Sequence, residues 1–158
     1  MLPRGVMSPP TGGDVAAALR ELQEQVLRDG GYYWWDELGE HDPRPASLEA
    51  WWASADRWES GTHSILDMDR VVAAADPPEW RHIADYGAVR PLSADGAVRL
   101  FGTSRPSRAE FEAVAGDYES PRYEEFMGEV TMRWTGLYVL LHEGERAAEV
   151  GFWGRSGD

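Results

Sequence analysis

The stretch between residues 32 and 58, YYWWDELGEHDPRPASLEAWWASADRW, holds five of the eight tryptophans in the chain. Each indole buries roughly 150–250 Å² when it packs, and its N–H needs a hydrogen-bond acceptor once it is buried. Five such rings close together therefore belong to a core or to a binding surface. Only Arg44 and Arg57 oppose the acidic residues that lie between and just beyond the rings, which are Asp36, Glu37, Glu40, Asp42, Glu49, Asp56 and Glu59.

Length and composition indicate one folded domain. A chain of 158 residues with 42% hydrophobic residues is long enough to bury a core and too apolar for a disordered segment. Residues 1–13, MLPRGVMSPPTGG, are rich in proline and glycine and lack the apolar run of a secretion signal, so we expect a flexible tail there and a single domain over 14–158. No run approaches about 18 apolar residues, which predicts no membrane span. The absence of cysteine excludes disulfides and makes a cytoplasmic location the expectation.

The chain carries 28 acidic residues against 15 basic ones, a net charge of −13. Such a field repels nucleic-acid phosphates and anionic membrane surfaces, and it attracts and steers a basic protein. We therefore expect a basic protein partner and no direct contact with nucleic acid or membrane, although an acidic surface also serves solubility alone. Every basic residue is arginine, which excludes a lysine Schiff base and a pyridoxal phosphate anchor.

Two helices are predicted to flank the first tryptophans. An apolar stripe with helical spacing predicts a helix over 14–29, capped by Asp14 and stopped by Gly30. Ser47 caps a second helix that reaches Glu59 and carries Trp51, Trp52 and Trp58 on its apolar face. Between them, an extended backbone places Tyr32 and Trp34 on one side and Tyr33 and Trp35 on the other, so that one pair enters the core and the other meets a groove or a partner.

The rest of the chain alternates between strand and helix signals. Asp95-Gly96 indicates a hairpin turn, Pro91 favours an edge strand, and Ser107-x-x-Glu110 is a capping box. The predicted elements are, in order, a strand over 62–68, a short helix over 69–75, a hairpin of 88–92 with 97–101, a helix over 107–118 and a helix over 120–134.

At the C-terminus, 137–142 and 147–153 flank Glu143-Gly144, which predicts an antiparallel hairpin with those two residues as its turn. This register pairs Tyr138 with Glu149 and His142 with Glu145. The complementary face, which we expect to be buried, holds Leu137, Val139, Leu141, Val150 and Phe152. The predicted fold is a single α+β domain with about four helices packed on one side of a small, mostly antiparallel sheet that includes a C-terminal β-hairpin.

Candidate catalytic residues are few. A small-molecule pocket near the hairpin would use His142, Glu149, Tyr138 and His63, but the same hairpin face suits the solvated side of an antiparallel sheet. His63, Asp67 and Asp69 have the spacing H-x3-D-x-D, yet a metal site needs three or more convergent ligands and one short segment rarely supplies them, so neither metal nor cofactor is predicted. The chain has no Gly-x-Ser-x-Gly elbow and no glycine-rich phosphate loop.

The function we expect is therefore protein binding by an acidic cytoplasmic module whose Trp and Tyr anchors, ringed by carboxylates, hold a basic protein. An inhibitor or immunity protein that neutralises a basic, nuclease-like toxin has this composition. The alternatives are an enzyme or ligand-binding protein with an aromatic pocket near the C-terminal hairpin, a DNA mimic, and a subunit of a larger assembly of unspecified oligomeric state. The predicted partner-binding residues are Tyr33, Trp35, Asp36, Glu37, Glu40 and Asp42.

Overall fold

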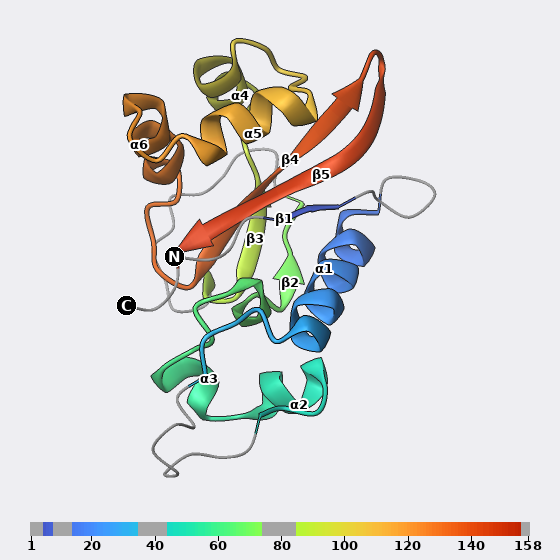
Figure 1. Cartoon of the computed structure of the whole chain (residues 1–158), viewed down its shortest axis with the longest axis vertical. Coiled ribbons are helices and arrows are strands. Elements are labelled where there is room, and N and C mark those ends of the chain that lie inside the picture. The colour runs from blue at the N-terminus through green and yellow to red at the C-terminus, as the bar shows by residue number, and fades with distance from the viewer. Residues whose placement is uncertain (1–4, 8–13, 35–43, 74–84, 156–158) are drawn as a thin grey trace.

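The computed structural model describes residues 5–7, 14–34, 44–73 and 85–155, and their arrangement is drawn in Figure 1. These residues form a mixed fold of helices and strands. In chain order its elements are β1 (Gly5–Met7), α1 (Val15–Asp29), α2 (Leu48–Ala53), α3 (Asp56–Glu59), the 3-10 helix η2 (Ile65–Asp67), β2 (Arg70–Val71), β3 (Ala88–Pro91), α4 (Ala94–Phe101), α5 (Arg108–Gly116), α6 (Pro121–Gly128), β4 (Thr135–Glu143) and β5 (Arg146–Arg155).

A five-stranded sheet in the order β1-β5-β4-β3-β2 runs through the molecule. Its two long strands, β4 and β5, form an antiparallel hairpin, and β1 pairs antiparallel with β5. On the other side β3 is parallel to β4, and β2 is parallel to β3. Most paired residues are therefore antiparallel, as expected, but the sheet is mixed, because β2 and β3 add parallel pairings that the sequence did not predict. Parallel neighbours need a long crossover, and α4, α5 and α6 provide it between β3 and β4.

Helices cover both faces of the sheet, rather than the single face that the sequence predicted (Figure 1). The part of the chain that the structure describes contains six α-helices. On one face, α4, α5 and α6 pack against Leu137, Val139, Leu141 and Trp153. On the other face, α1 and η2 pack against Val89, Val150 and Phe152. A third cluster, made of Trp34, Leu48, Trp51 and Leu66, anchors α2 beside η2.

The C-terminal hairpin is present as predicted, but its register differs. Its turn is Gly144-Glu145, and a bulge between Leu141 and His142 shifts the pairing again, so that Tyr138 lies opposite Phe152 and Glu149 opposite Leu141. The five apolar residues expected on one buried face are consequently divided between the two helix-covered faces. Leu137, Val139 and Leu141 face α4–α6, whereas Val150 and Phe152 face α1.

Local capping signals are matched by the structure. Asp14 accepts hydrogen bonds from the N–H groups of Ala16 and Ala17 at 3.0 and 3.1 Å and begins α1. Ser107 and Glu110 form the predicted capping box of α5. Each of these bonds satisfies a backbone donor that the first turn of a helix leaves without a partner. The same role is played by Ser47 in α2 and by Ser120 in α6.

Three predicted elements are wrong for local reasons. The helix expected over 47–59 divides into α2 and α3, because Ser54 is extended and its hydroxyl accepts the Asp56 N–H at 3.2 Å. The strand expected over 62–68 is the single turn η2, whose first residues are capped by Ser64. The arm 97–101 belongs to α4, because the Ser93 hydroxyl accepts the Gly96 N–H at 3.0 Å and caps a helix where a hairpin turn was expected.

Other boundaries also move. The helix expected to reach Trp134 ends at Gly128, and the segment expected to start a helix at Asp69 contributes β2. β3 is an interior strand, with Pro91 at its last position, so the predicted edge strand is wrong. Residues 5–7 of the predicted tail form β1, and the rest of that tail lies outside the described residues. Within the described ranges, no helix combines the length and the apolar character that a membrane crossing requires.

Candidate partner-binding surface

Five aromatic side chains lie together where α3 and the start of β4 meet, and we call them the aromatic row: Tyr33, His63, Trp134, Trp58 and Tyr86. Tyr33 stacks on His63 with ring centroids 5.2 Å apart. Trp58 stacks on Tyr86 at 6.0 Å and meets Trp134 edge-on at 5.8 Å. Tyr33 is 56% exposed and Trp58 43% exposed, whereas Trp134 is buried. Large rings that remain this accessible are the usual anchors of protein interfaces.

Gly61 and Thr62 join the two ends of the aromatic row. The Tyr33 N–H donates to the Thr62 carbonyl at 3.0 Å. The preceding residue, Gly61, lies so close to the Trp134 indole that an added Cβ would be 2.3 Å from Cη2. Gly61 also has φ +67°, which a residue with a side chain rarely adopts. The backbone at Gly61 and Thr62 therefore connects the Tyr33–His63 pair to the group formed by Trp58, Tyr86 and Trp134.

Two members of the row have unusual backbone geometry. His63 has φ 51° and Trp134 has φ 61°, and they are the two non-glycine residues with positive φ in the described part of the chain. A left-handed conformation costs an L-residue roughly 1–2 kcal/mol and persists only where the surroundings impose it. Because strained residues of this kind cluster at functional sites, their shared position distinguishes the aromatic row from the rest of the surface.

Beneath the row, a buried hydroxyl–carboxyl network fixes the loop that carries His63. Asp67 Oδ1 accepts hydrogen bonds from the Thr62 N–H and from Thr62 Oγ1, both at 2.8 Å. Thr62 Oγ1 is in turn 2.7 Å from Ser64 Oγ. Thr62, Ser64 and Asp67 are all fully buried. Their bonds hold the chain on either side of His63 and so set the direction of its ring.

Arg57 supports the other end of the row from below. Its guanidinium is buried, donates to the Asp67 carbonyl at 2.8 Å and forms an ion pair with Asp69 at 2.9 Å. The same group lies 4.1 Å from the centroid of the Trp58 ring, a cation–π contact. Arg57 thus ties Trp58 to the loop that Asp67 organises, because one side chain contacts both.

The Asp67 carboxyl is an unusual group for a protein interior. Burial raises its pKa to about 6, because desolvation outweighs the hydrogen bonds from Thr62 and Ser64 and the charge of Arg57, all of which lower it. Its Oδ2 atom has no hydrogen-bond partner among the residues that the structure describes. Asp67 is inaccessible to solvent, so it does not itself contact a bound molecule. Its hydrogen bonds to Thr62 instead fix the loop that carries His63.

The structure describes one of the six predicted partner-binding residues. Tyr33 is exposed at the end of the aromatic row, as expected. Its neighbour Trp34 points the other way and is 8% exposed, meeting Trp51 edge-on at 5.8 Å. This agrees with the predicted division of the YYWW run between core and surface. Five residues lie outside the described ranges, namely Trp35, Asp36, Glu37, Glu40 and Asp42.

The structure does not bring the alternative catalytic set together. Tyr138 packs on the α1 face beside Phe152, whereas Glu149 lies opposite Leu141 on the other face and pairs with Arg108 at 3.1 Å. The backbone N–H of His142 donates to the Pro106 carbonyl at 2.8 Å, and His63 belongs to the aromatic row. The shared face proposed for this set followed from the predicted register, which is wrong.

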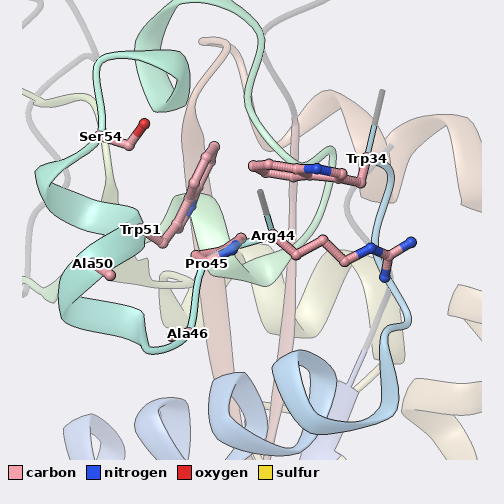
Figure 2. Close-up of a pocket in the computed structure, with 7 residues that line it drawn as sticks. All are labelled: Trp34, Arg44, Pro45, Ala46, Ala50, Trp51 and Ser54. Carbon is pink, nitrogen blue, oxygen red and sulfur yellow. The ribbon is translucent and has the colours of Figure 1, made fainter. Parts of the chain in front are cut away.

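A pocket of about 350 Å³ lies next to the core cluster of α2. Figure 2 shows its main walls, the rings of Trp34 and Trp51, with the side chain of Arg44 extending alongside. Its position differs from the pocket expected near the C-terminal hairpin. The residues that line it are Trp34, Arg44, Pro45, Ala46, Ala50, Trp51 and Ser54.

Sequence reasoning missed the buried supports of the surface. In the sequence Arg57 stands out only as a counter-charge and Asp67 only as part of a metal-like spacing, because burial of a charged residue leaves little trace in one sequence. Trp134 was placed on a helix, since its spacing from Tyr123 and Val130 suits a helical stripe. The available signal was the pair Gly61-Thr62 directly after a Trp-rich segment, which marks a close approach of the backbone to a large ring.

No protein family model, curated protein or solved structure matches this chain.

Proposed function

We propose that this protein is an acidic protein-binding module that holds a basic protein through the aromatic row. The observation that carries the proposal is the exposure of Tyr33 and Trp58 on a row whose backbone is strained at His63 and Trp134. A rigid, partly exposed aromatic surface gives contact area at a low cost in side-chain entropy, which is the character of an interface hot spot.

Charge supports a basic partner over a neutral one. The chain has a net charge of −13, and Asp56 and Glu59 flank the exposed Trp58 in sequence. Arg57, the basic residue between them, is buried and paired with Asp69, so its charge is not offered to solvent. The sequence-predicted contact residues Asp36, Glu37, Glu40 and Asp42 follow Tyr33 in the chain and lie outside the described residues. Acidic groups around aromatic anchors accelerate association with a cationic surface and select for it.

Within this class, the proposed role is that of an inhibitor or immunity protein that occupies the cationic cleft of a nuclease-like toxin in the cytoplasm. A nuclease must attract phosphates, so its active-site cleft carries the positive charge that a carboxylate-rimmed surface complements. A cysteine-free sequence is compatible with the reducing cytoplasm.

The test uses a photo-crosslinking amino acid, p-benzoylphenylalanine, in place of Tyr33 in cells of the source organism. The matched control carries the same group in place of Tyr118, an exposed tyrosine (62%) between α5 and α6. A protein that crosslinks from position 33 and not from position 118 is purified, and its affinity is measured by calorimetry in about 50 mM and about 500 mM NaCl. The proposal expects a basic partner whose affinity falls with salt. Equal crosslinking from both positions, or an affinity that salt does not change, contradicts it.

A further inference from the structure

Asp67 is hydrogen-bonded through one of its two carboxyl oxygens. Oδ1 accepts both bonds from Thr62, at 2.8 Å each, whereas Oδ2 is buried and has no hydrogen-bond partner within the described ranges. Oδ2 lies beside Gly61, where an added Cβ would be 3.0 Å from it and 2.3 Å from Cη2 of Trp134. The buried oxygen and the indole of the aromatic row therefore flank the same glycine.

Two of the helices around η2 offer this carboxyl no compensating charge. Gln23 of α1 donates to the Ile65 carbonyl at 2.9 Å, and Trp52 of α2 donates to the Leu66 carbonyl at 3.1 Å, and both side chains are neutral. The charged side chains that link these two helices are exposed and pair with one another, namely Arg20, Glu24 and Glu49.

Arg57 of α3 brings a buried positive charge, but its bonds are used elsewhere. Its guanidinium donates to the main-chain carbonyl of Asp67 and pairs with Asp69, which also pairs with Arg70. The loop 61–64 adds one ionisable side chain, that of His63. The charged residues of α3 on either side of Arg57 reach solvent, and they are Asp56 and Glu59.

The loop above the carboxyl is held in a costly conformation. His63 has φ 51°, and Trp134, which contacts the loop at Gly61, has φ 61°. An L-residue keeps such a backbone only where its surroundings impose it. The hydrogen bonds from Thr62 to Asp67 supply part of that constraint, because they fix the residue directly before His63.

We propose that Asp67 is a pH-sensitive latch: its neutral carboxyl keeps the loop 61–64 closed over it, and loss of the proton loosens the loop. An ionised carboxyl at this position is a negative charge without water around it, which is costly. When the loop lifts at Gly61 and the Trp134 indole turns aside, water reaches Oδ2 and the strain at His63 is released.

The direction of the pH effect follows from burial. Desolvation raises the pKa of Asp67 from its ordinary 3.8 to about 6 in the closed loop, whereas in the open loop the hydrated carboxyl returns toward the ordinary value. The stabilisation of the closed loop is therefore complete in acid and is lost as pH rises through about 6. A pKa difference of about two units makes opening up to about a hundredfold more frequent.

The latch would regulate the aromatic row, because the loop carries His63 and its Thr62 carbonyl accepts the Tyr33 N–H. Opening would disorder the surface that a partner contacts. This consequence for binding rests on the function proposed above. The latch itself is tested on the free protein, so the two proposals can fail separately.

Native-state hydrogen exchange, followed by ¹H–¹⁵N NMR, measures the opening. The N–H groups of Thr62 and Tyr33 report on the loop, since the first donates to Asp67 and the second to the Thr62 carbonyl. The Leu92 N–H, which donates to the Tyr138 carbonyl at 2.8 Å between β3 and β4, reports on unfolding of the core. Protection factors, which correct for the intrinsic pH dependence of exchange, are compared between about pH 4.5 and about pH 7.5.

The protection of Thr62 and Tyr33 should fall by up to about a hundredfold across this range and stay below that of Leu92. In low urea, exchange at Leu92 should accelerate while exchange at Thr62 and Tyr33 changes little, as is typical of local opening. The ¹³Cγ resonance of Asp67 should titrate with a midpoint near pH 6.

Two variants separate Asp67 from the other ionisable group of the loop. Asp67→Asn cannot lose a proton, so the protection of Thr62 and Tyr33 should stay level with pH. His63→Asn removes the imidazole, and because asparagine tolerates positive φ, this variant should keep the wild-type response. Thermal melts check that both variants are folded, and the wild-type measurements decide the question if one is not.

Three results would overturn the latch. The first is equal protection of Thr62, Tyr33 and Leu92 at every pH and urea concentration, which would mean that the loop opens only when the whole protein unfolds. The second is loop protection that does not fall with pH in the wild type. The third is a wild-type response that persists in Asp67→Asn or disappears in His63→Asn.

Discussion

The indole of Trp134 covers the α-carbon of Gly61. A Cβ added to Gly61 would lie 2.3 Å from Cη2 and 2.5 Å from Cζ3 of that ring. The two residues are far apart in the sequence, and their contact joins the loop after α3 to the residue before β4. Because Trp58 meets the edge of the same indole at 5.8 Å, this close approach sets the position of the exposed rings above it.

Gly61→Ala should destabilise the fold by about 3 kcal/mol, since a left-handed alanine costs roughly 1–2 kcal/mol and the clash with Trp134 adds an overpacking cost. Gly102→Ala is the matched control: Gly102 also has positive φ (+78°), but nothing lies within 4 Å of an added Cβ. The Gly102→Ala control should lose only the stability that the left-handed backbone conformation costs an alanine, about 1 kcal/mol. Urea unfolding of both variants measures the difference, and equal losses would show that the Trp134 contact is unimportant.

Asp67→Asn should change how stability depends on pH. The folded pKa of Asp67 is about 6, above the ordinary value of 3.8, so the folded protein binds this proton more tightly than the unfolded chain does. The stabilisation from this group is therefore present at low pH and is lost as pH rises toward and through 6. The free energy of unfolding of the asparagine variant, measured relative to that of the wild type, should therefore rise by about 2 kcal/mol between about pH 4.5 and about pH 7.5.

The measurement for Asp67 is urea unfolding of both proteins across this range. The comparison cancels the titration of the other carboxyl groups, which the two proteins share. A difference in unfolding free energy that stays constant with pH would mean that Asp67 titrates normally in the folded state.

Arg57→Met should destabilise the protein by about 2 kcal/mol or more, because it removes the buried guanidinium that pairs with Asp69, donates to the Asp67 carbonyl and supports Trp58, while Asp69 keeps its pair with Arg70. Adding Asp69→Asn should recover part of this loss, so that the double variant is less impaired than the sum of the single changes. Arg20→Met, which removes an exposed arginine that pairs with Glu49, should cause a much smaller loss. Urea unfolding of Arg57→Met, Asp69→Asn, the double variant and Arg20→Met measures these losses. If the losses of unfolding free energy for Arg57→Met and Asp69→Asn simply add up in the double variant, the two residues are not coupled.

Tyr33→Ala should weaken a complex with the basic partner by about 2 kcal/mol or more, the level that defines a hot spot, while changing the stability of the free protein little. The ring is 56% exposed, so its removal leaves no cavity in the core. Trp35→Ala is expected from the sequence to weaken the complex to a similar extent. Tyr118→Ala removes an equally exposed ring elsewhere and should leave the affinity unchanged. An equal loss of affinity for the variants at positions 33 and 118 would show that the aromatic row is not part of the interface.

Local chemistry made part of this fold predictable. Asp14, Ser47, Ser107 and Ser120 begin helices where their side chains cap the first turn, and the mixed α/β character with a C-terminal hairpin followed from the apolar spacing. Ser93 shows the limit of such signals. Ser-Ala-Asp-Gly suits either a hairpin turn or a helix start, and the packing of Leu100 and Phe101 against α5 and β4 favours the helix.

Long-range packing determined what could not be predicted. The hairpin register depends on a bulge after Leu141, and nothing in the alternation of 137–142 marks it. At Gly151 an added Cβ would meet the Phe111 ring at 2.7 Å, so the strand is placed by a helix that lies well before it in the chain. For the candidate surface, Tyr33 was identified because four large rings in a row cannot all be buried, whereas Arg57 and Asp67 were not, because their burial depends on partners brought together only in the folded protein.

Met7 pairs with Val150, so one edge of the sheet joins residues that lie far apart in the sequence. During synthesis on the ribosome, β1 emerges before β5 and cannot make this pairing until β5 has been made. Strand contacts this far apart in sequence form slowly, because closing the long intervening loop costs chain entropy before the strand pairing can stabilise it. The nascent protein therefore presents an unfinished edge until β5 has been synthesised, and in this interval a chaperone would have the most to protect.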